Sequence, residues 1–229
     1  MTLLATSAAA SCYSSIVNHW VCASYWRDYG SDLRSATVQH LEITALAVVL
    51  GVAVAVPLAL VARRFGWLRT PVLGVSTALY TIPSLALFPL LVPFTGLSRA
   101  TVVIGLAAYA LTILVRAILE GLDSVPTEVR DAAHGLGYGA ARRLVRVDLP
   151  LALPVILAGL RVATVSTVAL TTVGTVVSYG GLGQTIYDGW QTNFRAELFA
   201  GAVLCVLLAL VLDALLVLVG RLLTPWRRV

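Results

Sequence analysis

The sequence predicts an all-α polytopic membrane protein with about five transmembrane helices, and three observations support this fold class. Of the 229 residues, 59% are hydrophobic and only 12% are charged, whereas soluble proteins carry about 25% charged residues. Five separate stretches are apolar over the roughly 20 residues that a helix needs to cross a bilayer. The 16 basic residues are all arginine, and most of them lie beside those stretches.

The first 39 residues precede the membrane domain and are predicted to form an external or interfacial segment. Residues 1–26 contain no charged side chain but are rich in Ser and Ala, a composition that also suits a sixth span with the N-terminus in the cytosol. We favour an interfacial helix, because the segment ends in aromatic residues typical of membrane interfaces. These residues are Trp20, Tyr25, Trp26 and Tyr29. Cys12 and Cys22 can pair if the segment is external, but we favour two unpaired small residues.

Residues 40–225 are predicted to form the transmembrane domain, and residues 226–229 a cytosolic tail. The predicted spans are residues 41–62, 71–94, 101–119, 153–177 and 198–219. A proline inside a membrane helix bends it and frees backbone carbonyl groups. Pro83 and Pro89 in the second span are therefore candidates for kinks that line a transport pathway. Ordinary kinking is an equally weighted alternative, because proline is common in membrane helices.

The distribution of arginine predicts the orientation of the chain. Cytoplasmic loops of membrane proteins carry an excess of basic residues. Ten of the 16 arginines follow the first, third and fifth spans: Arg63, Arg64, Arg69, Arg130, Arg142, Arg143, Arg146, Arg221, Arg227 and Arg228. An odd number of spans places these three regions on one side, which we predict to be the cytosol. The C-terminus is then inside and the N-terminus outside.

The loop between the third and fourth spans, residues 120–150, is the most polar stretch in the second half of the chain. Pro126 suits the start of a short helix, and the three glycines at 135, 137 and 139 permit a sharp turn. Residues 140–147 are predicted to form a second short helix with a basic face, and Pro150 and Pro154 are predicted to close the loop before the fourth span. The small residues Ala132, Ala133 and Gly137 leave room for a partner to approach closely. The loop is thus either a compact docking knob or an ordinary amphipathic connector.

This loop resembles the "EAA" loop of permease subunits of bacterial ABC importers. That pattern reads Glu-Ala-Ala, three residues, Gly, and then a basic stretch that ends in Leu-Pro. The matching residues are Asp131, Ala132, Ala133, Gly137, Leu149 and Pro150. Asp131 replaces the usual Glu, which keeps the charge on a shorter side chain. The position of the loop between two spans agrees with the pattern.

Other segments are similar to the osmoprotectant branch of this family, which imports glycine betaine, choline, carnitine or related compatible solutes. The similar segments are His40-Leu41, Pro57-Leu58 and residues 82–86, 149–156, 158–161 and 180–183. Together they cover roughly residues 38–220. The resemblance implies the type I ABC importer permease fold, and a transport subunit rather than an enzyme.

The resemblance also implies the partners. Two permease subunits, identical or related, would enclose a pathway, a dimer of ATP-binding subunits would receive their loops, and an extracytoplasmic binding protein would deliver the solute. The residues implied in coupling to the ATPase are Glu128, Asp131, Ala132, Ala133, Gly135, Gly137, Arg142, Arg143, Leu149 and Pro150. We expect ATP on the partner subunit alone, with no cofactor, metal or nucleic acid on this chain and the lipid bilayer around it.

Arg161 and Asp213 are charged residues within the fourth and fifth spans. Charged side chains inside a membrane are costly and are usually paired. At 1.5 Å per residue, both should lie roughly 12–16 Å inside the cytosolic ends of their spans. The matched depth predicts that they approach each other or that each lines the aqueous path. A structural pair is favoured over a contact with solute.

Alternative functions remain open. The permease of an importer for another small polar solute, such as methionine, would share the loop. A self-sufficient secondary transporter or channel usually shows internal repeats or more intramembrane ionisable groups, and the sequence shows neither. An enzyme is disfavoured because His19, His40 and His134 are scattered. The absence of Lys excludes a P-loop in this chain.

Overall fold

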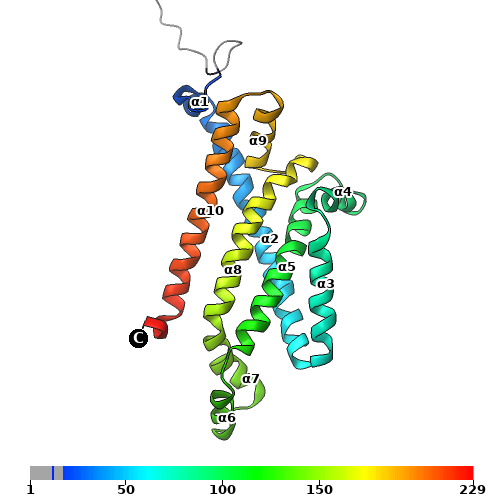
Figure 1. Ribbon diagram of the computed structural model, residues 1–229, viewed down its shortest axis with the longest axis vertical. Helices are drawn as coiled ribbons and strands as arrows, with labels where there is room; N and C mark the ends of the chain where they lie inside the picture. Colours follow the sequence, from blue (N-terminus) through cyan, green and yellow to red (C-terminus); the bar gives the residue numbers. More distant parts are fainter. Residues whose placement is uncertain (1–11, 13–17, 229) are drawn as a thin grey trace, which may run out of the picture.

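The structure, a computed structural model, describes residue 12 and residues 18–228, and almost all of them are helical (Figure 1). The elements in chain order are α1 (Ala23–Asp28), α2 (Gly30–Arg64), η1 (Gly66–Leu68), α3 (Arg69–Thr81), α4 (Ser84–Thr95), α5 (Arg99–Asp123), α6 (Thr127–Gly135), α7 (Ala140–Arg143), η2 (Leu144–Asp148), α8 (Leu149–Thr171), η3 (Thr172–Val177), α9 (Leu182–Gln191), α10 (Arg195–Leu223) and η4 (Pro225–Arg228). Of these, η2 is a π-helical turn and the other η elements are 3₁₀ helices.

Four continuous helical segments are long and apolar enough to cross a membrane: α2, α5, the segment that contains α8, and α10. A fifth span results when the bent pair of α3 and α4 is counted as one. The predicted all-α architecture of about five spans is therefore confirmed. In the described part of the N-terminal segment, α1 is short, and α2 begins at Gly30, before the predicted start of the first span. The alternative of a sixth span falls mostly outside the described residues.

The second predicted span is broken rather than kinked. Between α3 and α4 the chain bends by 101°. Proline disfavours helical backbone in the residue before it, and Ile82, which precedes Pro83, is extended with φ −67° and ψ 125°. The hydroxyl of Tyr109 in α5 donates a hydrogen bond to the Ile82 carbonyl, which the end of α3 leaves free. Pro89 lies inside α4, which continues past it.

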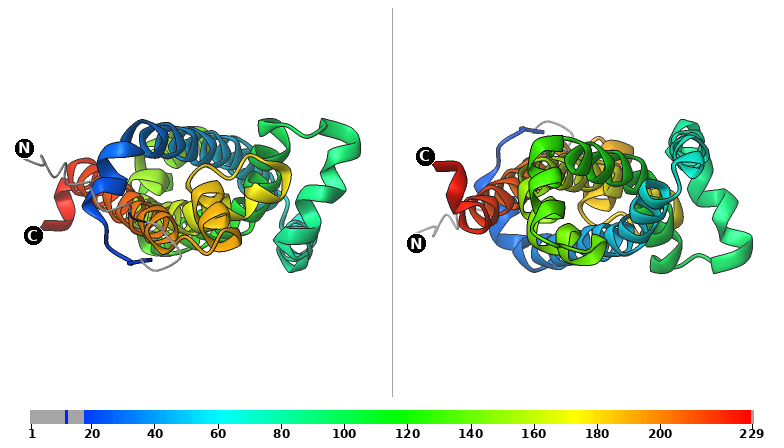
Figure 2. Two further views of the ribbon diagram at one scale, coloured as in Figure 1. Left: turned by 90° about the horizontal axis from the view of Figure 1, so that it is seen from above. Right: turned by 90° about the horizontal axis from the view of Figure 1, so that it is seen from below.

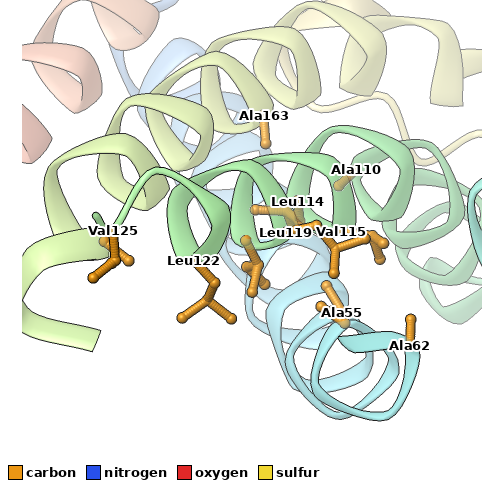
Figure 3. Close-up of a cluster of buried hydrophobic side chains, with 12 residues drawn as sticks. Ala55, Ala62, Ala110, Leu114, Val115, Leu119, Leu122, Val125 and Ala163 are labelled. Atoms are coloured by element: carbon orange, nitrogen blue, oxygen red, sulfur yellow. The ribbon is translucent and has the colours of Figure 1, made fainter. Parts of the chain in front are cut away.

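Helix α5 lies at the centre of the bundle and packs against α2, α3, α4 and α8. A cluster of buried apolar side chains joins α2, α5 and α8 (Figure 3). Small residues allow these helices to approach closely, since a Cβ atom on Gly159 of α8 would lie only 2.1 Å from the Cβ of Ala117 in α5. Close backbone contact of this kind is typical of membrane helices, because lipid removes most of the hydrophobic drive for their association.

Two segments that the sequence singled out pack against each other near α9. His40 of α2 is buried, and its Nε2 lies 3.0 Å from the carbonyl oxygen of Val168 in α8. Gly181, in the turn before α9, has φ +55°, and a Cβ there would lie 2.7 Å from the Cα of His40. The backbone of this turn therefore lies directly on α2, which only glycine permits at this position.

The described part of the N-terminal segment contains a disulfide and is hydrogen-bonded to the turn between α9 and α10. A disulfide joins Cys12 and Cys22, so the favoured interpretation of two unpaired cysteines is wrong. Spacing along the chain did not reveal that these two side chains meet. The Asn18 side chain donates a hydrogen bond to the Asn193 carbonyl at 2.6 Å and accepts one from the Arg195 N–H at 3.0 Å.

The arginine-rich regions gather at one end of the molecule. In Figure 1 the junction of α2 and α3, the helices α6 and α7, and the C-terminus all lie toward the lower end, whereas α1, α4 and α9 lie toward the upper end. This arrangement agrees with the prediction that an odd number of spans brings these regions to one side. Seen along the helices the bundle is elongated, with α10 near one end and α4 at the other (Figure 2).

Candidate functional site in the loop between α5 and α8

The first half of the 120–150 loop is a helix closed by a glycine turn. As predicted, α6 begins directly after Pro126. At its end the N–H of Tyr138 donates to the Ala133 carbonyl at 3.0 Å, and the N–H of Gly137 donates to the His134 carbonyl at 2.9 Å. These two bonds form a Schellman motif, in which one residue adopts the left-handed conformation. Gly137 takes that position with φ +78°, so its role is to shape the turn.

Most of the residues predicted to couple to an ATPase lie on the surface of the loop. The exposed ones are Glu128, Asp131, Ala132, Gly135, Gly137 and Arg142. Ala133, by contrast, is 5% exposed and packs inside the loop. Neighbouring residues on a helix differ in direction by about 100°, so Ala132 and Ala133 face different surroundings. The expectation that both leave room for a partner is therefore corrected for Ala133.

The second half of the loop runs without a break into α8. Residues 140–147 are helical as predicted, but the helix changes to the π-helical turn η2 after Arg143. Leu149 and Pro150 are the first residues of α8, and Pro154 lies inside it. The expectation that Pro150 and Pro154 close the loop before the fourth span is wrong, because the helical segment continues through both residues. Pro150 is tolerated because it lies in the first turn of α8, where a proline is favourable.

Asp148, the last residue of η2, lies at the centre of an arginine cluster that sequence reasoning missed. Its side chain is 2% exposed, and its Oδ2 accepts a hydrogen bond from Nη2 of Arg63 at 2.9 Å. The Nε atoms of Arg130 and Arg143 lie 3.7 Å and 3.8 Å from its two carboxylate oxygens. The only hint in the sequence is that Asp148 is the single acidic residue in the basic stretch before Leu149.

The charged residues within the fourth and fifth spans meet in an ion pair with two hydrogen bonds. Nε and Nη2 of Arg161 each donate to one carboxylate oxygen of Asp213, both at 2.8 Å. The pair joins α8 to α10 and stays 40% and 32% exposed on its two sides. Two hollows between these helices, of about 300 and 520 Å³, both include Arg161 in their lining.

The remaining predicted positions lie apart from the loop. Pro83 and Pro89 belong to the start and the interior of α4, toward the opposite end of the molecule (Figure 1). Among the described residues, no group of three or more His, Cys, Asp and Glu side chains is placed to hold a metal ion. The loop, the Arg161–Asp213 pair and the α3–α4 break are thus three separate features.

Comparison with known proteins gives concordant results. Residues 47–229 match the family described as "Binding-protein-dependent transport system inner membrane component". The chain is 40% identical over 206 residues to the osmoprotectant import permease protein OsmW of Salmonella typhimurium, which covers 88% of this chain and 96% of that protein. It is 33% identical over 196 residues to the choline transport system permease protein OpuBB of Bacillus subtilis, over 86% of this chain and 90% of that one.

The fold also resembles a solved structure. A chain of the MetNI methionine ABC transporter, in an inward-facing conformation, superposes with a TM-score of 0.72 and 20% sequence identity. The superposition covers 84% of this chain and 96% of that chain. At this level of identity the likeness concerns the fold.

Proposed function

The chain belongs to the binding-protein-dependent transport system inner membrane components, and from this premise we propose that it is the permease subunit of an ATP-driven importer for compatible solutes. Glycine betaine, choline, carnitine and proline-type osmoprotectants are the expected solutes. The observation that carries the proposal is the similarity to osmoprotectant and choline permeases along nearly the whole chain. ATP hydrolysis belongs to a separate subunit.

The 120–150 loop is the surface on which that ATP-binding subunit docks. The support is its exposed face, formed by Asp131, Ala132 and the turn at Gly137, and its position at the arginine-rich end of the molecule. Arg142, stacked over the ring of Tyr138 at 4.5 Å, adds a positive charge to this face. Movement of the docked ATPase subunits would shift the loop and, through α8, the spans.

Two independent features support the proposed orientation, with the C-terminus in the cytosol and the N-terminus outside. Regions rich in arginine tend to stay in the cytosol, which supports a cytosolic loop and C-terminus. Disulfides persist in oxidising compartments, so the bond between Cys12 and Cys22 supports an external N-terminal segment. The arginine-rich regions and the disulfide lie at opposite ends of the molecule, so a cytosolic site for the former and an external site for the latter are compatible.

The remaining features take supporting roles. Arg161 and Asp213 form a structural pair that holds α10 to α8. The broken α3–α4 segment, with Pro83 at the break, lines a pathway shared with a second permease subunit, identical or related. An extracytoplasmic binding protein meets the end that carries α9.

Reconstitution tests the proposal. The chain is co-expressed with its ATP-binding subunit, purified and placed in nanodiscs, and ATP hydrolysis is measured with binding protein and glycine betaine. We expect the two subunits to co-purify and hydrolysis to rise only when binding protein and solute are both present. Ala132→Trp should reduce co-purification, because a bulky side chain on the exposed face of α6 obstructs docking.

The matched control is Ala100→Trp, the same substitution at an exposed position near the start of α5, on the opposite side of the membrane. It should leave co-purification unchanged. Solute uptake driven by an ion gradient without ATP would contradict the proposal and favour a secondary transporter. Stimulation by methionine but by no quaternary ammonium solute would assign the permease to another class of cargo.

A further inference from the structure

Asp148 draws together three parts of the chain that are far apart in sequence. Arg63 comes from the end of α2, Arg130 from α6 and Arg143 from α7. The carboxylate is almost completely buried, so water does not replace any of these partners. The end of the first span and both halves of the 120–150 loop therefore share one anionic centre.

The charge balance makes this carboxylate hard to replace. Within the described part of the chain, none of the three arginines pairs with another carboxylate, and buried nitrogens of all three have no hydrogen-bond partner. Removal of one partner from a buried ion pair is strongly unfavourable, because the remaining charges stay buried without compensation. Without Asp148 the guanidinium groups would repel one another, and the loop would lose its ionic contact with α2.

The backbone at Asp148 is also unusual. Residues 144–148 form the π-helical turn η2 between α7 and α8. Such turns are uncommon and occur frequently at functional sites. Here the turn ends on the buried carboxylate, so the direction of the side chain toward α2 depends on it.

We propose that Asp148 is a positioning residue that fixes the 120–150 loop to the cytosolic end of α2 through Arg63. Displacement of the loop by the ATPase is then transmitted to the first span as well as to α8, which continues from the loop directly. This inference rests on the proposed function and assigns the loop a second mechanical connection.

Arg63→Gln is the decisive substitution. It removes the ion pair with α2 but keeps the apolar contacts of Leu144 and Leu149 and leaves Asp148 with Arg130 and Arg143 inside the loop, so the loop can still fold and dock. In nanodiscs with the ATP-binding subunit, we expect unchanged co-purification and ATP hydrolysis. The amount of solute moved per ATP should fall about fivefold or more, as for the loss of a typical coupling free energy between sites. Arg63→Lys, which keeps the charge, should restore most of it.

The nearby pair of Arg69 and Asp123 supplies the control. Its side chains are 46% and 40% exposed, and exposed pairs of this kind contribute little, so Arg69→Gln should keep the wild-type ratio. An unchanged ratio in Arg63→Gln would overturn the inference. Loss of the ATPase subunit from Arg63→Gln would also overturn it, because Arg63 would then serve docking itself.

A second variant, Asp148→Asn, should lower the same ratio at least as much as Arg63→Gln. If Asp148→Asn moved more solute per ATP than Arg63→Gln does, the central role of Asp148 would be contradicted. Transport by the wild-type complex distinguishes failure of the proposed function from failure of the inference about Asp148. Failure of wild-type transport would refute the proposed function and this inference with it, whereas normal wild-type transport beside an unaffected Arg63→Gln would refute this inference alone.

Discussion

Gly137 owes its place in the 120–150 loop to its backbone conformation. A Cβ at this position would meet nothing within 4 Å, but its φ of +78° is unfavourable for residues other than glycine. The sequence pattern placed a glycine here without showing why. The structure assigns it to the Schellman motif that closes α6.

Gly137→Ala should therefore weaken docking of the ATPase subunit, because the left-handed conformation costs a residue with a Cβ about 1–2 kcal/mol. Gly137→Asn should lose less, since Asn adopts this conformation more readily. Gly139→Ala is the control: Gly139 has φ −64° and open space around it. Co-purification of the ATPase subunit measures the effect, and equal retention by Gly137→Ala and Gly139→Ala would contradict the backbone argument.

Tyr109 provides a second test at the residue scale. Its hydroxyl satisfies the carbonyl of Ile82 at the α3–α4 break, and an unsatisfied carbonyl inside a membrane protein is unfavourable. Tyr109→Phe should lower the free energy of unfolding by about 1 kcal/mol, measured as a lower melting temperature in detergent. Tyr80→Phe, at a neighbouring ring that is 47% exposed, should have a smaller effect. A larger loss for Tyr80→Phe would argue against this role.

At the scale of the helices, the Arg161–Asp213 ion pair connects α10 to α8. In α10 the buried residues, Ala196, Ala200 and Gly201, all lie near its N-terminal end. Arg161 and Asp213 join the two helices well beyond that region. The pair therefore joins α10 to α8 in a part of α10 where no side chain is buried.

Asp213→Leu should destabilise the protein more than the double variant Arg161→Leu/Asp213→Leu. The single change leaves an arginine without its counter-charge in an apolar region, whereas the double change removes both charges. The folded fraction after purification in detergent, followed by size-exclusion chromatography, measures the difference. A double variant that is less stable than the single one would show that the pair contributes more than charge neutralisation.

The elements differ in how well the sequence predicted them. Runs of about 20 apolar residues identified α2, α5, α8 and α10, because their length alone meets the requirement of a bilayer. The direction of α4 after the break was not predictable, since it depends on contacts with α5, such as the one at Tyr109. Likewise, the partners of Asp148 include Arg63, 85 residues away, and no local pattern indicates such a contact.

The whole molecule has two chemically different ends, and this polarity predicts its topology. In spheroplasts, an impermeant reductant followed by an impermeant maleimide should label Cys12 and Cys22, because the proposed orientation puts their disulfide outside. Trp67→Cys, at a 75% exposed position beside the arginine-rich end, should react only after permeabilisation. Labelling of Trp67→Cys in intact spheroplasts would contradict the predicted orientation of the chain in the membrane.

The π-helical turn before α8 predicts where insertions and deletions are tolerated among relatives of this protein. A π-turn corresponds to one extra residue accommodated within a helix, and each residue of an α-helix rotates the following side chains by about 100°. A relative without the extra residue would present a different side chain to Arg63, even if every other residue were the same. Insertions and deletions within residues 144–148 should therefore be rare in lineages that keep Asp148, and a one-residue gap there should accompany a compensating change at the end of the first span.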